Sequence, residues 1–182
     1  MAEILNDRLH AEREGEFVVF LVGMRINRLR KVHRWLPVAT SAPRMVREQE
    51  HEGLLGSRFF RSGLREFTIL QYWESFEALR SYARGADTEH RTWWGRFNEM
   101  ASEDDTVGIW HETYLVDGEG YETVYRHMPA TGLGAAEGSE LVPATGSRES
   151  AAGRLGRSEG ADPAGVTAGA DAPTAADGGV ER

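Results

Sequence analysis

The chain has 182 residues, with no cysteine, a single lysine and no aromatic residue after Tyr125. Without cysteine it has no disulfides, thiolate metal sites or thiol nucleophile. The C-terminal region is rich in Gly, Ala and Ser, so it offers too little apolar surface to offset backbone ordering of roughly 1–2 kcal/mol per residue. We therefore predict a polar lead over residues 1–16, one folded domain over residues 17–136 and a disordered tail over residues 137–182.

Several classes of function are disfavoured by what else is missing. The longest apolar run, residues 17–24, is too short to span a bilayer, and residues 1–16 contain no apolar stretch, so we expect no signal peptide. The net charge of −8 does not favour nucleic acid. Neither a dinucleotide-binding nor a phosphate-binding glycine motif is present, and no histidine pair has metal-ligand spacing. We expect a soluble cytoplasmic protein with no metal site and with neither nucleic acid nor membrane as a partner.

The apolar pattern predicts alternating strands and helices. Residues 17–24 are apolar on both faces, which is typical of a central strand. The other expected elements follow from caps, turns and periodicity: a helical region from Arg28 capped by Asn27 and restarted at Ser41, strands over residues 54–60 and 64–73, helices over 76–84 and 88–101 capped by Ser75 and Asp87, and strands over 106–116 and 121–128.

This order of elements is that of a ferredoxin-like, split βαβ domain of the α+β class. Helices on one face of a single sheet leave the other face uncovered. A second copy of the chain would cover it most simply, so we predict a homodimer.

Two regions place histidine beside aromatic residues. His90 begins the expected helix 88–101 and shares its inward stripe with Trp94. It could be a structural histidine, a base or an axial haem ligand. In the strand 106–116, alternation puts His111 on one face and Trp110 with Glu112 on the other. Whichever of His111 and Glu112 faces the interior is the candidate catalytic group, although structural roles are equally compatible with the pattern.

Further candidates lie around the first strand and among the indoles. Arg25 and Asn27 at the end of that strand could orient a substrate oxygen, and His33 could be a surface group or support the site. The chain has five tryptophans, a density that suits a pocket for a flat or hydrophobic ligand. The candidate lining indoles are Trp35, Trp73, Trp94 and Trp110.

The segment Tyr72-Trp73-Glu74-Ser75-Phe76-Glu77-Ala78-Leu79 resembles the strand-to-helix segment of the antibiotic-biosynthesis monooxygenase superfamily. The segments at residues 20–27, 31–37, 43–45, 108–114 and 121–123 are similar to one monooxygenase-like branch, formerly a domain of unknown function and named after a fumagillin-pathway polyketide monooxygenase.

The resemblance implies a dimeric α+β barrel that binds a small hydrophobic molecule and is often an oxygenase without a prosthetic group. It implies His111 or His90 as the base and Arg25 or Asn27 as the holder of a developing oxyanion. Relatives that bind haem imply an alternative in which His90 is the iron ligand. A non-catalytic ligand-binding barrel is the third possibility.

Overall fold

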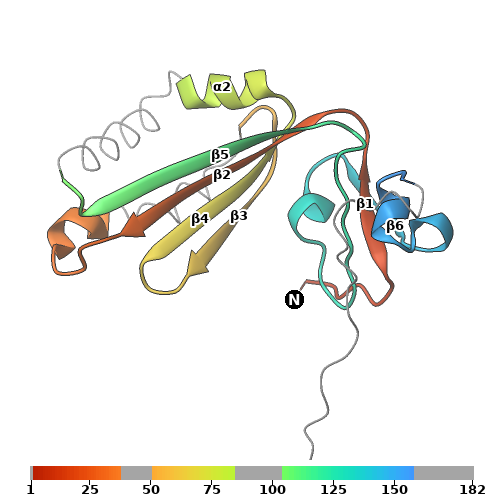
Figure 1. Ribbon diagram of the computed structural model, residues 1–182, viewed down its shortest axis with the longest axis horizontal. Helices are drawn as coiled ribbons and strands as arrows, with labels where there is room; N and C mark the ends of the chain where they lie inside the picture. The colour runs from red at the N-terminus through yellow and green to blue at the C-terminus, as the bar shows by residue number, and fades with distance from the viewer. Residues whose placement is uncertain (1, 38–50, 85–103, 158–182) are drawn as a thin grey trace, which may run out of the picture.

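The computed structural model describes residues 2–37, 51–84 and 104–157, and an antiparallel four-stranded sheet forms its centre (Figure 1). The strands stand in the order β3-β4-β2-β5. They are β2 (Phe17–Ile26), β3 (Leu54–Ser62), β4 (Glu66–Trp73) and β5 (Val107–Val116). Residues 32–37 are helical, and helix α2 (Phe76–Arg84) follows β4. The predicted ferredoxin-like α+β class is confirmed by this strand order.

One face of the sheet carries helices, and strand pairing shows which side chains belong to it. Val18 of β2 pairs with Trp73 of β4 and with Leu115 of β5, so these three side chains lie on one face. Leu79 of α2 packs against Val18 and Trp73. We call this the helix-bearing face, and we call the opposite side the open face.

Helix α2 begins where the sequence predicts. The Ser75 hydroxyl accepts a hydrogen bond from the Ala78 backbone N–H at 3.1 Å, so it satisfies one of the free donors of the first turn. The hairpin turn consists of Gly63, Leu64 and Arg65, in which Gly63 has a φ of 77°, whereas Ser62 ends β3 and pairs with Glu66. The following strand therefore begins at Glu66 rather than at residue 64.

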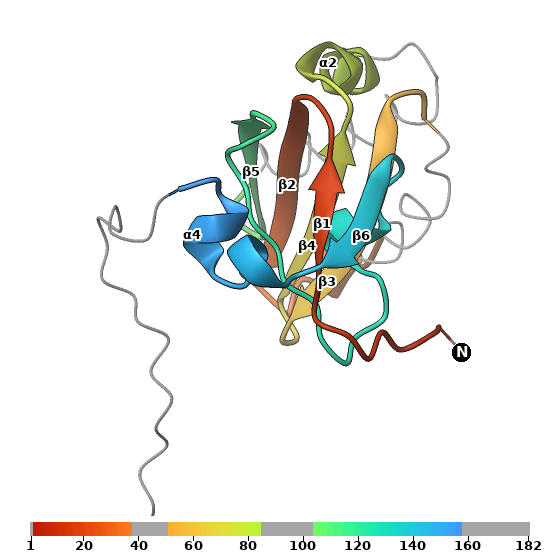
Figure 2. The same cartoon turned by 90° about the vertical axis from the view of Figure 1, so that its right-hand side faces the viewer.

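A second, two-stranded sheet covers one end of the open face. β1 (Leu9–Arg13) pairs antiparallel with β6 (Ser139–Pro143), and both lie in front of the larger sheet in Figure 2. Ala11 of β1 and Leu133 of the short helix η1 (Gly132–Ala135) form a buried cluster with Phe17. We call β1, β6 and the segment 117–157 that surrounds them the cap.

The cap corrects part of the prediction of a disordered tail, and it includes residues 9–13 of the polar lead as β1. Residues 137–157 contain β6, η2 (Gly146–Arg148) and α4 (Ala151–Arg154), whereas residues 158–182 lie outside the described part. Residues 137–157 have too few apolar residues for a core of their own. They are ordered because β6 pairs with β1 and the segment packs on the buried cluster around Phe17.

Two other expected elements differ. Residues 121–128 form no strand; only Tyr125 and Met128 make isolated bridges, to Leu9 and Leu5, and His127 has a left-handed φ of 53°. The helix expected from Arg28 begins at residue 32. The expected restart at Ser41 and the expected helix 88–101 lie outside the described residues. None of the helices in the described part is long and apolar enough to cross a membrane.

Candidate functional site

The helix-bearing face has a central area with mixed apolar and polar side chains. α2 packs on one end of this face at Trp73, and Trp35 packs on the other end against Met24 and Ile26. Between these ends, strand pairing brings together six residues from three strands, which we call the site face: Phe20, Val22, Ile69, Gln71, His111 and Thr113.

His111 is the candidate base on the site face. It pairs with Val22 in the register of β2 and β5, which fixes its side chain on the helix-bearing face. The side chain is exposed, and its ring centroid lies 5.9 Å from that of Phe20 with the rings tilted by 40°. An imidazole on a largely apolar surface can accept a proton from a substrate that rests on the same surface.

Glu112 lies on the open face and is separated from His111 by the sheet. It pairs with Leu21, is exposed and accepts a hydrogen bond from the Tyr114 hydroxyl at 2.6 Å. That carboxylate raises the pKa of Tyr114. The structure therefore places His111 on the helix-bearing face and Glu112 on the opposite face, with both side chains exposed.

Arg25 and Asn27 are not brought to His111. Arg25 is exposed on the open face, where it pairs with Glu66 of β4 and Gly108 of β5. Asn27 follows the end of β2 and donates its backbone N–H to the Thr106 carbonyl at 2.9 Å. A substrate oxygen that both residues hold would therefore lie away from the site face.

The described indoles have different environments. Trp73 is fully buried, so it is part of the core rather than a wall open to a ligand. Trp35 is half-buried and donates its indole N–H to the Leu29 carbonyl at 3.0 Å. Trp110 lies over Gly23 on the open face, where a Cβ on that glycine would come within 2.3 Å of the indole.

The remaining candidates do not add to the site face. His33 is exposed in the helical residues 32–37. His90 and Trp94 lie outside the described residues, so the structure does not place them.

Gln71 and Tyr82 were missed by the sequence reading. Gln71 is 2% exposed, and its side-chain oxygen accepts the Trp73 indole N–H at 3.1 Å. Burial raises the pKa of Tyr82 to about 12, although a hydrogen bond from Gln71 opposes the rise. The sequence does contain a signal for Gln71. It lies two residues before Trp73 in the same strand, and residues two apart lie on the same face of a sheet. This buried polar group fixes one side of the site face.

Two ion pairs lie at the end of the sheet where β2 ends and β5 begins. Lys31 Nζ lies 2.6 Å from Asp104 Oδ2, and Arg28 Nε lies 2.6 Å from Asp105 Oδ1. The hydrogen bond from Lys31 lowers the pKa of Asp104, and the hydrogen bond from Arg28 lowers that of Asp105. These pairs connect the exit of β2 to the entry of β5.

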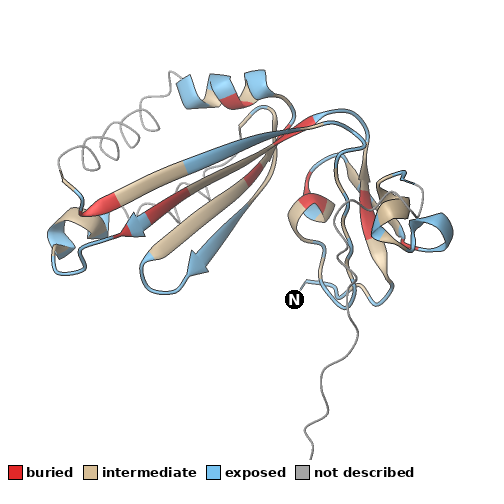
Figure 3. Cartoon of the chain, in the orientation of Figure 1, coloured by how far each residue is buried: buried red, intermediate tan, exposed pale blue. Residues whose placement is uncertain are grey.

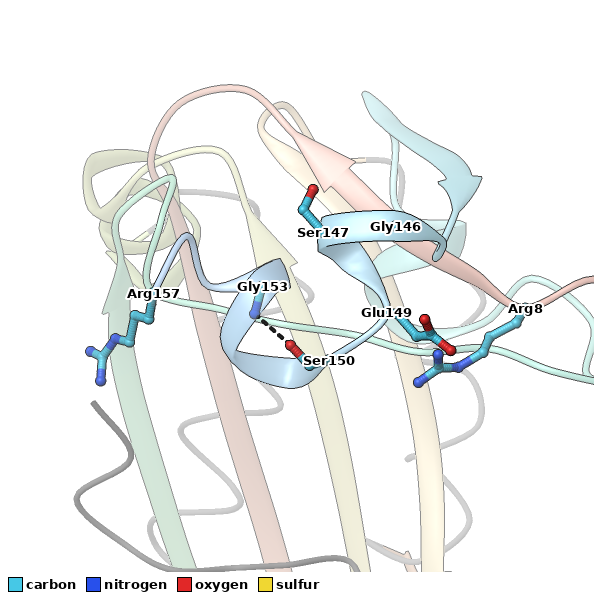
Figure 4. Close-up of a pocket in the computed structure, with 7 residues that line it drawn as sticks. All are labelled: Arg8, Gly146, Ser147, Glu149, Ser150, Gly153 and Arg157. Atoms are coloured by element: carbon cyan, nitrogen blue, oxygen red, sulfur yellow. Dashed lines mark hydrogen bonds between the residues drawn. The ribbon is translucent and has the colours of Figure 1, made fainter. Parts of the chain in front are cut away.

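The described pockets belong to the cap and not to the site face. One, of about 690 Å³, is lined by residues around η2 and α4, with Arg8 and Arg157 on different sides in Figure 4. Another, of about 260 Å³, lies beside His10 and Tyr121. Within the described ranges, no group of three His, Asp or Glu side chains could hold a metal ion.

The profile of a known family, monooxygenase af470-like, matches residues 17–133. The chain belongs to this family. The match covers the four-stranded sheet and α2, and it confirms the monooxygenase-like branch that the sequence resembles. No protein with a curated description matches the chain.

Several solved structures are similar to this chain at low identity. An aldoxime dehydratase in complex with butyraldoxime is 16% identical, with a TM-score of 0.56, over 75% of this chain and 43% of that protein. SnoaB, a cofactor-independent oxygenase of Streptomyces nogalater, is 11% identical over 54% of this chain and 90% of its own, with a TM-score of 0.35. MhuD, a haem degrader of Mycobacterium tuberculosis with two haems in its active site, is 19% identical over 54% and 94%, with a TM-score of 0.33.

Proposed function

We propose that the protein is a monooxygenase that acts on a small hydrophobic or aromatic substrate without a prosthetic group. The observation that carries this proposal is the position of His111 on the helix-bearing face beside Phe20, in a chain of a monooxygenase-like family. Val22 of β2 lies beside His111 and Ile69 of β4 lies beyond Val22, and these apolar side chains suit an aromatic substrate. Because one fold hosts many activities, the assignment rests on these residues.

In the proposed reaction the substrate supplies all of the electrons that reduce dioxygen. His111 takes a proton from an acidic CH₂ group between aromatic or carbonyl neighbours, and the resulting carbanion gives one electron to dioxygen. The two radicals combine into a peroxide, which takes up the proton and then loses water to leave a carbonyl. In total R₂CH₂ and O₂ give R₂CO and H₂O, so one oxygen atom enters the product and the other leaves as water.

The residues have separate roles in this scheme. His111 holds the proton, while Phe20 and Val22 form the apolar surface beside it on which the substrate rests. The Thr113 hydroxyl, two residues along the same face of β5, is placed to donate to the developing oxyanion. Arg25 and Asn27 fit that role less well because they lie away from this surface. His90 remains an alternative base outside the described residues.

An oxygen-uptake assay tests the proposal. The full-length protein is supplied with a panel of anthrone-like and phenolic substrates, and dioxygen consumption is measured with an electrode beside product analysis. We expect one dioxygen per product, and a fall of about 10²–10⁴-fold in His111→Gln if this imidazole is the general base. The matched control is His33→Gln, an exposed histidine away from the site face, which should keep wild-type turnover. Unchanged turnover in a variant that lacks both His90 and His111 would refute the assignment.

Haem is the second candidate group, and the chemistry of the site face fits it. A haem needs an imidazole toward the iron and an apolar surface for its ring. His111 with Phe20 and Val22 offers both within the described part, and His90 is the ligand that the family resemblance implies. Bound haem would supply dioxygen activation. Titration with haem decides: a Soret band lost in His90→Ala or His111→Ala supports it, and the absence of a band removes it.

We also propose that the protein is a homodimer formed through the open face. The cap covers only the end of this face near Phe17. Beyond it, Phe60 and Tyr114 are exposed, with 37% and 50% of their surface accessible. A second copy would cover this area.

A further inference from the structure

One end of the four-stranded sheet combines several exposed arginines with exposed aliphatic side chains. At this end β2 finishes, β5 starts and the β3–β4 hairpin turns, as seen at the left of Figure 1. The Ile26 backbone N–H donates to the Arg65 carbonyl at 2.7 Å, and Asn27 donates to Thr106. These bonds make the hairpin turn and residues 27–32 one continuous surface, which we call the basic end.

The basic end is rich in arginine although the whole chain carries −8, and the described acidic residues at its edge are Glu66, Asp104 and Asp105. Residues 58–65 are all exposed and include three arginines and no acidic residue. The two aspartates of this end are already paired, Asp105 with Arg28 and Asp104 with Lys31. Among the described residues, no carboxylate forms an ion pair with Arg30, Arg61 or Arg65. These three positive charges are therefore available to an anionic partner.

Aliphatic side chains stand between these arginines. Leu64 in the hairpin turn has 74% of its surface exposed, and Val32 and Leu29 are 45% and 37% exposed. The whole hairpin turn is coloured as exposed in Figure 3. The hairpin holds its shape, because Arg61 Nε donates to the Gly63 carbonyl at 2.8 Å and its guanidinium lies 6.0 Å from the Phe67 ring. The exposed side chain of Leu64 therefore lies on a turn that a hydrogen bond stabilises.

We propose that the basic end docks the protein on an anionic lipid surface. An aliphatic side chain on a convex turn gains from burial in a deformable apolar phase, while flanking arginines stay at the level of the headgroups. Stacking on nucleic acid would need free aromatic faces, but Phe59 stacks on Phe67 and Phe60 lies under Arg58. This proposal revises the expectation of no membrane partner for surface contact only, and it does not depend on the proposed reaction.

Vesicle flotation with the full-length protein tests the proposal. At low salt, we expect binding to vesicles of phosphatidylcholine with about a third phosphatidylglycerol, weak binding to phosphatidylcholine alone, and release by high salt. Each arginine near such a surface contributes about fivefold in binding, so Arg61→Gln with Arg65→Gln should weaken it by about 25-fold. Leu64→Ser should weaken binding while leaving its salt dependence. The matched control replaces Arg80 and Arg84 of α2, at the other end of the sheet, and should bind as wild type.

Three results would overturn the lipid proposal. The first is equal binding to neutral and anionic vesicles, and the second is equal loss in the α2 control and in the hairpin variant. The third is retention on an acidic polymer without any vesicle binding, which would indicate a polyanionic macromolecule as the partner instead. Circular dichroism of each variant shows whether it is folded, so a loss of binding by unfolding is recognised.

Discussion

At the scale of single residues, the cap contains a buried histidine among charged groups. His10 is 5% exposed, and its Nε2 atom has no hydrogen-bond partner in the described part of the chain. Burial lowers its pKa from the usual 6.5; Glu12, 3.7 Å away, opposes this, and Arg148 and Arg154 add to it. The folded state therefore prefers neutral His10.

This preference predicts how stability changes with pH. The unfolded chain protonates His10 near 6.5, whereas the folded chain protonates it only at lower pH. Its contribution is therefore fully present above about pH 6.5 and is lost as the pH falls through the folded-state pKa. Urea denaturation at pH 7.5 and 5.5 should show a smaller difference for His10→Gln than for wild type.

His33→Gln is the control for this measurement because His33 is exposed. It should keep the wild-type difference between the two pH values. If His10→Gln keeps it as well, the buried imidazole does not set the pH dependence, and the stated direction of its pKa shift is irrelevant to stability.

At the scale of elements, the features that depend on neighbours in sequence were predictable. The apolar run of β2, the Ser75 cap and a hairpin turn at Gly63 are local signals, and the structure has each of them, with the turn extending to Arg65. β1 and β6 were missed because each is short and weakly apolar. Their partner is remote in sequence, and only packing on Phe17 and Leu133 makes the pairing favourable.

The same distinction applies to the candidate site. Alternation along β5 already separated His111 from Glu112, but the choice between the faces required knowing where α2 packs. Gln71 was missed since its importance comes from Trp73 and Tyr82 around it, and not from any motif. The sequence therefore predicts which residues share a face of a strand, whereas tertiary packing decides which face the helices cover.

The η2–α4 segment depends on one buried arginine, which gives a second prediction. The Arg154 side chain is 4% exposed; it contacts the Glu122 carboxylate at 2.7 Å and donates to the carbonyls of Arg148 and Glu149. A four-residue helix such as α4 is not stable alone. Arg154→Ala should therefore destabilise this segment by about 2 kcal/mol, because it leaves these acceptors unpaired.

Hydrogen exchange measures this effect locally. The amides of Leu155 and Gly156, which bond to Ala151 and Gly153, should exchange at least about tenfold faster in Arg154→Ala. Arg157→Ala is the control, because that side chain is exposed. Equal protection in both variants would mean that backbone pairing alone holds the segment.

At the scale of the whole molecule, the open face shows what the cap leaves uncovered. Two rows cross the sheet there, and their residues are set by strand register: Arg58, Leu70, Leu21 and Glu112 in one, and Phe60, Thr68, Gly23 and Trp110 in the next. Leucines in the middle and aromatic rings at the sides make this area apolar with charged margins, which is the usual anatomy of a protein interface.

The proposed homodimer makes the last prediction. Phe60→Glu places a charge in the apolar rows, and desolvating it on association should weaken the dimer by more than about tenfold. Phe76→Glu is the matched control: Phe76 is 44% exposed at the start of α2, where a carboxylate is compatible with the helix dipole. Sedimentation velocity over a concentration series measures both. A dimer unaffected by Phe60→Glu would use another surface, whereas a monomeric wild type would remove the dimer and leave the open face exposed to water.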